Sequence, residues 1–238
     1  MTVAVTFDAG RTLLVLDTAM LAGRLAERGL DVEAAALAAA EPGAWQAYER
    51  AVAHPEQAPT DSWQVFMRAL IAGAAPALAE ATVAEQAAWL FAEQPRRNLW
   101  RRLMPGMIEL VDELRAAGVP VAVVSNTEGT LAALLDEIGV GDRFVAVADS
   151  RRLAIEKPDP RIFAWVAARL GVAPAEIVHV GDSWAADVVG ARNAGARAIW
   201  FGPATTPTND PAIACAADAA EVRAVLVSWG VLPPPPPA

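Results

Sequence analysis

The sequence predicts an α/β fold in which a doubly wound parallel sheet forms the core and an α-helical domain is inserted after the first strand. Its strand-like segments are short, continuous apolar runs, which are typical of parallel strands covered on both faces. From residue 107 onward, helical and strand-like segments alternate, and repeated β–α units imply right-handed crossovers within one sheet. Between the first strand and this alternation, the pattern is helical.

The first expected element is a strand at Val3–Phe7, which stops at Asp8, and Gly10 permits a turn after it. From about Leu16 to Leu103 we find helical patterns and no convincing strand, with prolines marking the interruptions. The helices expected in this stretch are Thr18–Arg28, Val32–Ala53, Ser62–Ala72 and Thr82–Phe91.

After Pro105-Gly106 the pattern changes to alternating helices and strands. The expected helices are Met107–Ala117, Thr130–Ile138, Pro160–Leu170 and Ala185–Ala194. The expected strands are Val119–Val124, Phe144–Ala148, Ile177–Val180 and Ala198–Phe201. The domains are therefore residues 1–15 and 104–238 for the core and 16–103 for the helical insertion, with a proline-rich, disordered tail at 233–238.

Composition narrows the class of partner. The 238 residues carry a formal net charge of −9, which argues against a nucleic-acid or anionic-membrane surface but allows a small anionic substrate in a locally positive pocket. Cys215 is the only cysteine, so an intrachain disulfide is excluded. No apolar run approaches the roughly 20 residues that a transmembrane helix needs. We expect a soluble, cytoplasmic protein, and the sequence leaves its oligomeric state open.

Polar residues directly follow three of the expected strands. They are Asp8, the pair Ser125-Asn126 and the pair Gly181-Asp182, and Lys157 lies in a loop before a helix. Because ligands of open parallel sheets bind beyond the carboxyl ends of the strands, these side chains are expected to converge at one edge. A turn or a helix cap accounts for any one of these residues, but not for the whole set.

The chemistry of this set indicates a metal-assisted reaction. Two carboxylates that converge repel one another unless a cation or a proton lies between them, and Mg²⁺ suits oxygen ligands. Lys157 is the only lysine beside 18 arginines, and its compact ammonium is poorly replaced by a planar guanidinium in a tight anionic site. A carboxylate beside Mg²⁺ and a lysine is equipped to attack an electrophile that carries anionic oxygens.

With these motifs in this order, the chain resembles the haloacid dehalogenase-like (HAD) hydrolase superfamily. The matching segments are Phe7-Asp8-Ala9-Gly10-Arg11-Thr12-Leu13, Val124-Ser125-Asn126, Lys157-Pro158, and Gly181-Asp182-Ser183 with Asp187 and Gly190-Ala191. The resemblance implies a Rossmann-like core. It also implies that residues 16–103 form the mobile helical C1 cap of subfamily I.

The resemblance also implies roles for the residues at the sheet edge. Asp8 is then the nucleophile that forms an aspartyl-phosphate or an ester. Ser125 hydrogen-bonds the transferring group of the substrate, and Asn126 supports it. Lys157 neutralises charge on Asp8 and on the substrate oxygens.

The metal site implied by the resemblance holds Mg²⁺ with Asp8, Asp182 and the backbone carbonyl of Gly10. Asp187 is expected either to join the metal ligands or, more simply, to orient the metal's waters or Lys157 from behind. His179, inside an expected strand, is predicted to be a packed residue and not a catalytic base.

Two positions depart from the family pattern. Phosphatases of this family carry a second aspartate two positions after the nucleophile, and here that position is Gly10, which cannot protonate a leaving group. General acid–base catalysis typically contributes about 10² to 10⁴ in rate, so poor leaving groups are expected to react slowly. At the next position, Arg11 replaces a usually small residue, and it either holds a substrate anion or extends into solvent.

These departures leave three functions open. The first is Mg²⁺-dependent hydrolysis of a small organophosphate that has a good leaving group, or whose leaving group is protonated by an acid of the cap or of the substrate itself. The second is dehalogenation through an Asp8 ester, which needs no acid but is disfavoured by Asp182, since an acid there repels a substrate carboxylate. The third is a protein that keeps the fold and only binds a ligand or partner. A phosphonatase is excluded because residues 16–103 contain no lysine, and a β-phosphoglucomutase-like enzyme needs the missing aspartate.

Overall fold

The computed structural model describes residues 3–53, 62–202 and 209–234. It divides into two compact units, one formed by Met1–Val15 with Trp100–Ala238 and the other by Leu16–Leu99. The first contains the sheet and is called the core unit below, and the second is called the helical unit. Of the expected proline-rich tail, residues 235–238 lie outside the described part of the chain.

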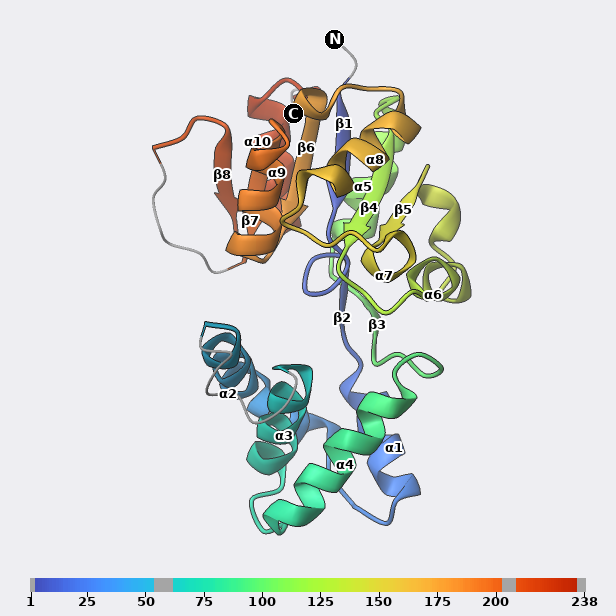
Figure 1. The fold of residues 1–238 in the computed structure, drawn as a ribbon, viewed down its shortest axis with the longest axis vertical. Helices are drawn as coiled ribbons and strands as arrows, with labels where there is room; N and C mark the ends of the chain where they lie inside the picture. Colours follow the sequence, from blue (N-terminus) through green and yellow to red (C-terminus); the bar gives the residue numbers. More distant parts are fainter. Residues whose placement is uncertain (1–2, 54–61, 203–208, 235–238) are drawn as a thin grey trace. The chain divides into compact units, whose positions relative to one another are not determined.

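A six-stranded parallel sheet is the framework of the described core unit, in the order β5-β4-β1-β6-β7-β8 (Figure 1). This confirms the predicted α/β class and places β1 in the middle, between β4 and β6. The strands are β1 (Ala4–Phe7), β4 (Val121–Ser125), β5 (Val147–Asp149), β6 (Ile177–Gly181), β7 (Arg197–Phe201) and β8 (Ile213–Ala216).

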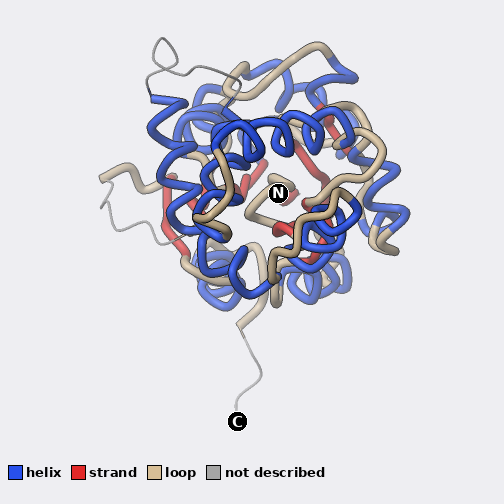
Figure 2. Tube along the Cα trace, turned by 90° about the horizontal axis from the view of Figure 1, so that it is seen from below, coloured by secondary structure: helices blue, strands red, loops and turns tan. Residues whose placement is uncertain are grey.

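Helices cover both faces of the sheet, and the strands, red in Figure 2, run among them. On one face lie α5 (Met107–Ala116), α6 (Leu131–Glu137) and α10 (Ala219–Ser228), and on the other lie α8 (Pro160–Leu170) and α9 (Val189–Asn193). The central strand is buried on both sides, since Val5 and Phe7 pack into the first apolar cluster and Ala4 packs into the second. This two-sided burial explains why the strands are continuous apolar runs.

The helical unit consists of four helices in its described residues. They are α1 (Thr18–Glu27), α2 (Ala34–Ala53), α3 (Ser62–Ala74) and α4 (Glu80–Glu93). Asp17 caps α1 by accepting a hydrogen bond from the amide of Met20 at 2.9 Å. The helices α2 and α3 approach closely at Gly73, where an added Cβ would lie 3.0 Å from the Cβ of Ala40. None of the described helices is long and apolar enough to cross a membrane.

The structure corrects several predictions of local structure. The expectation of no strand between Leu16 and Leu103 is wrong, because β3 (Trp100–Leu103) pairs with β2 (Leu14–Leu16) in a separate two-stranded sheet. The segment of β3, WRRL, lacks a recognisable strand pattern because it is partly exposed and carries two arginines. The helix predicted at Ala185–Ala194 begins with a π-helical turn at Trp184–Val188 and continues as α9.

Other elements were not anticipated. The edge strand β8 has the sequence IACA and two of its four residues are alanine, a weak β-former, so it lacks a strong strand pattern. The following α10 and the short α7 (Ser150–Leu153) were also unpredicted. By contrast, α8 begins and ends where the sequence places it, because Asp159 caps its start and Gly171 adopts the left-handed conformation at its end.

The buried aromatic residue Phe163 gives a test of the packing on the α8 face. Its ring is fully buried and stands edge-on to the His179 ring, with centroids 5.0 Å apart. We expect Phe163→Ala to lower the free energy of unfolding by about 3–5 kcal/mol, because a large cavity remains. The matched control Phe163→Leu should cost less than about 1.5 kcal/mol. Denaturant unfolding measures both, and an alanine variant as stable as the leucine variant would contradict this packing.

Candidate active site

The candidate site lies at the carboxyl ends of the three central strands. Asp8 directly follows β1, Ser125 ends β4, and Gly181 ends β6 just before Asp182. Because β1 lies between β4 and β6, these residues are brought together although they are far apart in the sequence. The amide of Asp8 donates to the carbonyl of Val180 at 2.8 Å, which ties the loop after β1 to β6.

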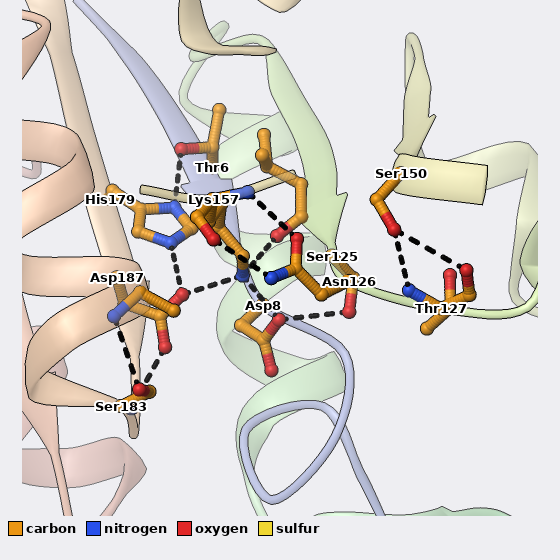
Figure 3. A network of polar contacts seen from close by, with 12 residues as sticks. Thr6, Asp8, Ser125, Asn126, Thr127, Ser150, Lys157, His179, Ser183 and Asp187 are labelled. Atoms are coloured by element: carbon orange, nitrogen blue, oxygen red, sulfur yellow. Dashed lines mark hydrogen bonds and ion pairs between the residues drawn. The ribbon is translucent and has the colours of Figure 1, made fainter. Parts of the chain in front are cut away.

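The two carboxylate oxygens of Asp8 differ in their surroundings. Its Oδ1 accepts hydrogen bonds from Ser125 Oγ at 2.8 Å and from Lys157 Nζ at 2.5 Å (Figure 3). Its Oδ2 accepts no hydrogen bond from any described residue. Burial raises the pKa of Asp8 and Lys157 opposes this shift. One oxygen is therefore fixed by the protein, and the other is available to a cation or an electrophile.

Lys157 is the centre of the polar network. Its buried ammonium donates to Asp8 Oδ1 and to Asp187 Oδ1, each at 2.5 Å, and to the carbonyl of Val124 at 2.7 Å. These three acceptors match the three N–H donors of an ammonium. Burial alone would lower the pKa of Lys157, but the carboxylates of Asp187 and Asp8 outweigh it and raise this pKa well above its usual value.

Asn126 holds the backbone that carries Lys157. Its side-chain amide donates to the carbonyl of Lys157 at 3.0 Å, and its Oδ1 accepts from the Lys157 amide at 2.9 Å. This pair of hydrogen bonds fixes the two loops relative to one another. Asn126 was expected to support Ser125 at the substrate. In the structure its amide group supports the backbone of Lys157, and a role at the substrate stays a prediction.

Asp187 is surrounded by donors from the protein. Its Oδ1 contacts Lys157 Nζ and His179 Nε2, the latter at 3.0 Å, and its Oδ2 accepts from the Ser183 amide at 2.9 Å. A Cβ added to Gly181 would lie 2.3 Å from its carboxyl carbon, so the glycine leaves room for this side chain. Burial would raise the pKa of Asp187, but Lys157 and His179 hold it far below its usual range. Asp187 is thus placed to orient Lys157.

His179 belongs to the network and is not only a packed strand residue. It is fully buried, and its Nδ1 lies 2.9 Å from Thr6 Oγ1, its partner across β1 and β6. Because the Asp187 carboxylate can only accept, Nε2 is the donor in this contact. Sequence reasoning missed this role. The sequence signal for this contact is a polar residue, Thr6 and His179, within each of two otherwise apolar strands.

Asp182 and Arg11 face each other on the other side of Asp8. Arg11 Nη1 lies 3.0 Å from Asp182 Oδ2, so the arginine points into the site, one of its two predicted orientations. The indole of Trp200 donates to the Asp182 carbonyl at 2.9 Å and fixes the backbone of this loop. Burial and the neighbouring charge of Asp8 raise the pKa of Asp182 to about 7. The charge of Arg11 opposes this rise in the pKa of Asp182 but does not cancel it.

The donor set suits a hard divalent cation. One carboxylate oxygen from each of Asp8, Asp182 and Asp187 lies within 4.8 Å of the others. All of these donors are oxygen atoms, and carboxylate oxygens are the ligands that Mg²⁺ prefers. Burial raises the pKa of Asp8, and burial and the charge of Asp8 raise the pKa of Asp182, whereas Lys157 and His179 hold the pKa of Asp187 below its usual range. Asp8 and Asp182 are the fitting ligands.

Comparison with known proteins identifies the family. A model of the haloacid dehalogenase-like hydrolases matches residues 3–195. The chain belongs to this family. Phosphoserine phosphatase from Thermus thermophilus is 37% identical over 150 residues, which are 62% of this chain and 57% of that enzyme. Haloacid dehalogenase-like hydrolase domain-containing protein 3 from Bos taurus is 31% identical over 202 residues, which are 80% of this chain and 78% of that protein.

Solved structures of HAD hydrolases share the fold. A magnesium-bound structure of the HAD-hydrolase YfnB from Bacillus subtilis has a TM-score of 0.66 at 20% identity, over 94% of this chain and 98% of that one. A HAD family hydrolase from Deinococcus radiodurans, with bound phosphate and sodium, has a TM-score of 0.60 at 22% identity, covering 98% and 99%. At such identities the likeness is one of fold.

The single lysine allows its protonation to be observed directly. We expect the ¹³Cε signal of lysine-labelled protein to stay constant through the pH range near 10.4 in which ordinary lysines titrate, because the pKa of Lys157 is raised. The stabilisation from this lysine is then fully present below the ordinary lysine pKa and is lost as the pH rises through the folded-state value. Nuclear magnetic resonance titration provides the measurement.

The matched variant for this titration is Asp187→Asn, which keeps the shape and removes one negative charge. The titration of Lys157 should then move to lower pH, since the larger of its two carboxylate interactions is lost. A wild-type signal that titrates like an ordinary lysine would show that the ammonium is not held between the two carboxylates.

Proposed function

We propose that the protein is a Mg²⁺-dependent hydrolase of small organophosphates that carries the phosphoryl group on Asp8 and acts best on substrates with good leaving groups. The observation that supports this most is the buried contact of Asp8 with Lys157 and Ser125, beside a second carboxylate at Asp182 whose pKa is raised by burial and by the charge of Asp8. Relatives named as phosphatases, including phosphoserine phosphatase and phosphoglycolate phosphatase, support the same reaction class.

In the first step a carboxylate oxygen of Asp8 attacks phosphorus. An oxygen–phosphorus bond forms to Asp8, and the ester bond to the leaving group breaks, with its electron pair going to the leaving oxygen. Lys157 holds Asp8 in place and places positive charge beside the transferring group, and Ser125 fixes Oδ1. A bound Mg²⁺ would neutralise phosphoryl oxygens and draw Asp8 and the substrate together.

In the second step water attacks the phosphorus of the aspartyl-phosphate. The bond to Asp8 breaks with its electron pair returning to the Asp8 carboxylate, inorganic phosphate leaves, and the proton released by the water passes to solvent. Protonation of the leaving group in the first step has no donor at Gly10, so the proton comes from solvent or from the substrate. Acyl and aryl phosphates, whose leaving groups are stable as anions, are therefore the proposed substrate class.

The nucleophile is tested by hydrolysis of p-nitrophenyl phosphate, whose aryl leaving group needs little protonation. We expect Mg²⁺-dependent release of p-nitrophenol by the wild-type protein, lost on chelation of the metal. In Asp8→Asn it should fall to background, because the amide cannot accept the phosphoryl group. The variant keeps the size of the side chain, and its circular dichroism serves as the folding control.

Equal traces of turnover in wild type and Asp8→Asn would contradict phosphoryl transfer to Asp8. The same pair of proteins should then be supplied with 2-haloacids. Halide release that depends on Asp8 and not on metal would establish dehalogenation instead, and its absence would favour a binding protein.

The missing acid can be restored at Gly10. Its backbone is not in the left-handed region, and a Cβ built there meets no atom within 4 Å, so a side chain fits. We expect Gly10→Asp to raise kcat/KM for alkyl phosphates by up to about 10² to 10⁴, the usual contribution of a general acid, and to change aryl phosphate hydrolysis little.

Gly10→Asn is the matched control, since it fills the same space without a titratable proton. It should leave the preference for aryl over alkyl phosphates as in the wild type. An aspartate variant with an unchanged preference would show that leaving-group protonation does not limit this enzyme.

A further inference from the structure

The pair between Arg11 and Asp182 brings a fixed cation to one of the two fitting metal ligands. Arg11 Nη1 lies 3.0 Å from Asp182 Oδ2, and both residues belong to the core unit. Their side chains are 31% and 16% exposed, so neither is sealed away from ions in solution. A metal cation that binds Oδ2 of Asp182 therefore lies close to the guanidinium of Arg11 and is repelled by it.

The charges of the site show what this guanidinium changes. The cluster of three carboxylates carries three negative charges when ionised, and Lys157 carries one positive charge. The remainder is two negative charges, which one divalent cation neutralises. Arg11 reduces this remainder to one negative charge, and the attraction of the site for a divalent cation is reduced with it.

The backbone at Arg11 has a conformation that is uncommon for a residue with a side chain. Its φ angle is +57°, in the left-handed region that glycine adopts readily and that residues with a Cβ rarely adopt. An arginine in this position is less favourable for the turn than a glycine would be. Its side chain is nevertheless directed at Asp182.

We propose that Arg11 is a tethered cation that competes with the divalent metal for Asp182 and so lowers the affinity of the protein for the metal. Binding of the metal cation to Asp182 then weakens or excludes the ion pair between Arg11 and Asp182, and this ion pair in turn opposes binding of the cation. This inference rests on the proposed metal-dependent function. It extends that function by assigning to Arg11 control over metal loading, a role separate from contact with substrate.

The competing explanations predict different metal affinities. If Arg11 only ordered the loop after β1, its removal would loosen the segment that carries Asp8, and the metal would bind more weakly. If Arg11 only bound a substrate anion, the metal affinity measured without substrate would not change. Competition alone predicts tighter metal binding when the charge is removed.

The experiment is calorimetric titration of the full-length protein with Mg²⁺, without substrate or phosphate, at fixed pH and ionic strength. The variants are Arg11→Gln, which removes the charge, Arg11→Lys, which keeps it, and Arg11→Gly, which suits the left-handed backbone. We expect Kd to fall by about fivefold in the glutamine and glycine variants, the size expected for loss of a partly exposed ion pair. The lysine variant should stay within about twofold of wild type.

Thermal melting in the presence of a chelator tests whether each variant is folded. If Arg11→Gln is not folded, Arg11→Gly replaces it as the charge-free variant. Equal or weaker Mg²⁺ binding by the charge-free variants would overturn the competition while leaving the metal-dependent function in place. A lack of Mg²⁺ binding in all four proteins would overturn both proposals. The two failures are therefore distinguishable.

Discussion

The site depends on one buried interaction, the contact of the Lys157 ammonium with Asp8, Asp187 and the carbonyl of Val124. Three acceptors from three different segments converge on three N–H donors, and a planar guanidinium does not present donors in this geometry. This explains why a chain with 18 arginines has its single lysine here. A buried ammonium without these carboxylates would be strongly unfavourable, so the lysine and the acids require one another.

The three carboxylates are divided by their neighbours into different tasks. Asp187 accepts from Lys157, His179 and the Ser183 amide, and these donors hold its pKa far below the usual range. Asp182, in contrast, is buried near Asp8, and its pKa is raised to about 7. Environments that move the pKa values of neighbouring acids in opposite directions are typical of sites with distinct roles. Here Asp187 is held as an anion that positions the lysine, whereas burial and the charge of Asp8 disfavour the anionic form of Asp182.

The loop after β1 is where this chain differs from the pattern of phosphatases in its family. At Gly10 the aspartate of the family pattern is absent, and at Arg11 a cationic side chain replaces a usually small one. Both changes make the charge of the site more positive. The first change narrows the proposed substrates to those whose leaving groups need no proton. The second brings a guanidinium to a carboxylate that suits a metal. Asp8, in the same loop, still contacts Lys157.

By itself, the sequence determined the α/β class, the parallel sheet, most helices, and the convergence of Asp8, Ser125, Lys157 and Asp182. These features are readable because apolar runs, caps and turn glycines act between neighbours in the chain, as at α8. Only the tertiary structure decided the roles of contacts between distant segments. His179 meets Thr6 across 173 positions, Arg11 reaches Asp182 while remaining partly exposed, and β3 pairs with β2. No local pattern encodes such pairs, because each depends on which strands become neighbours in the folded sheet.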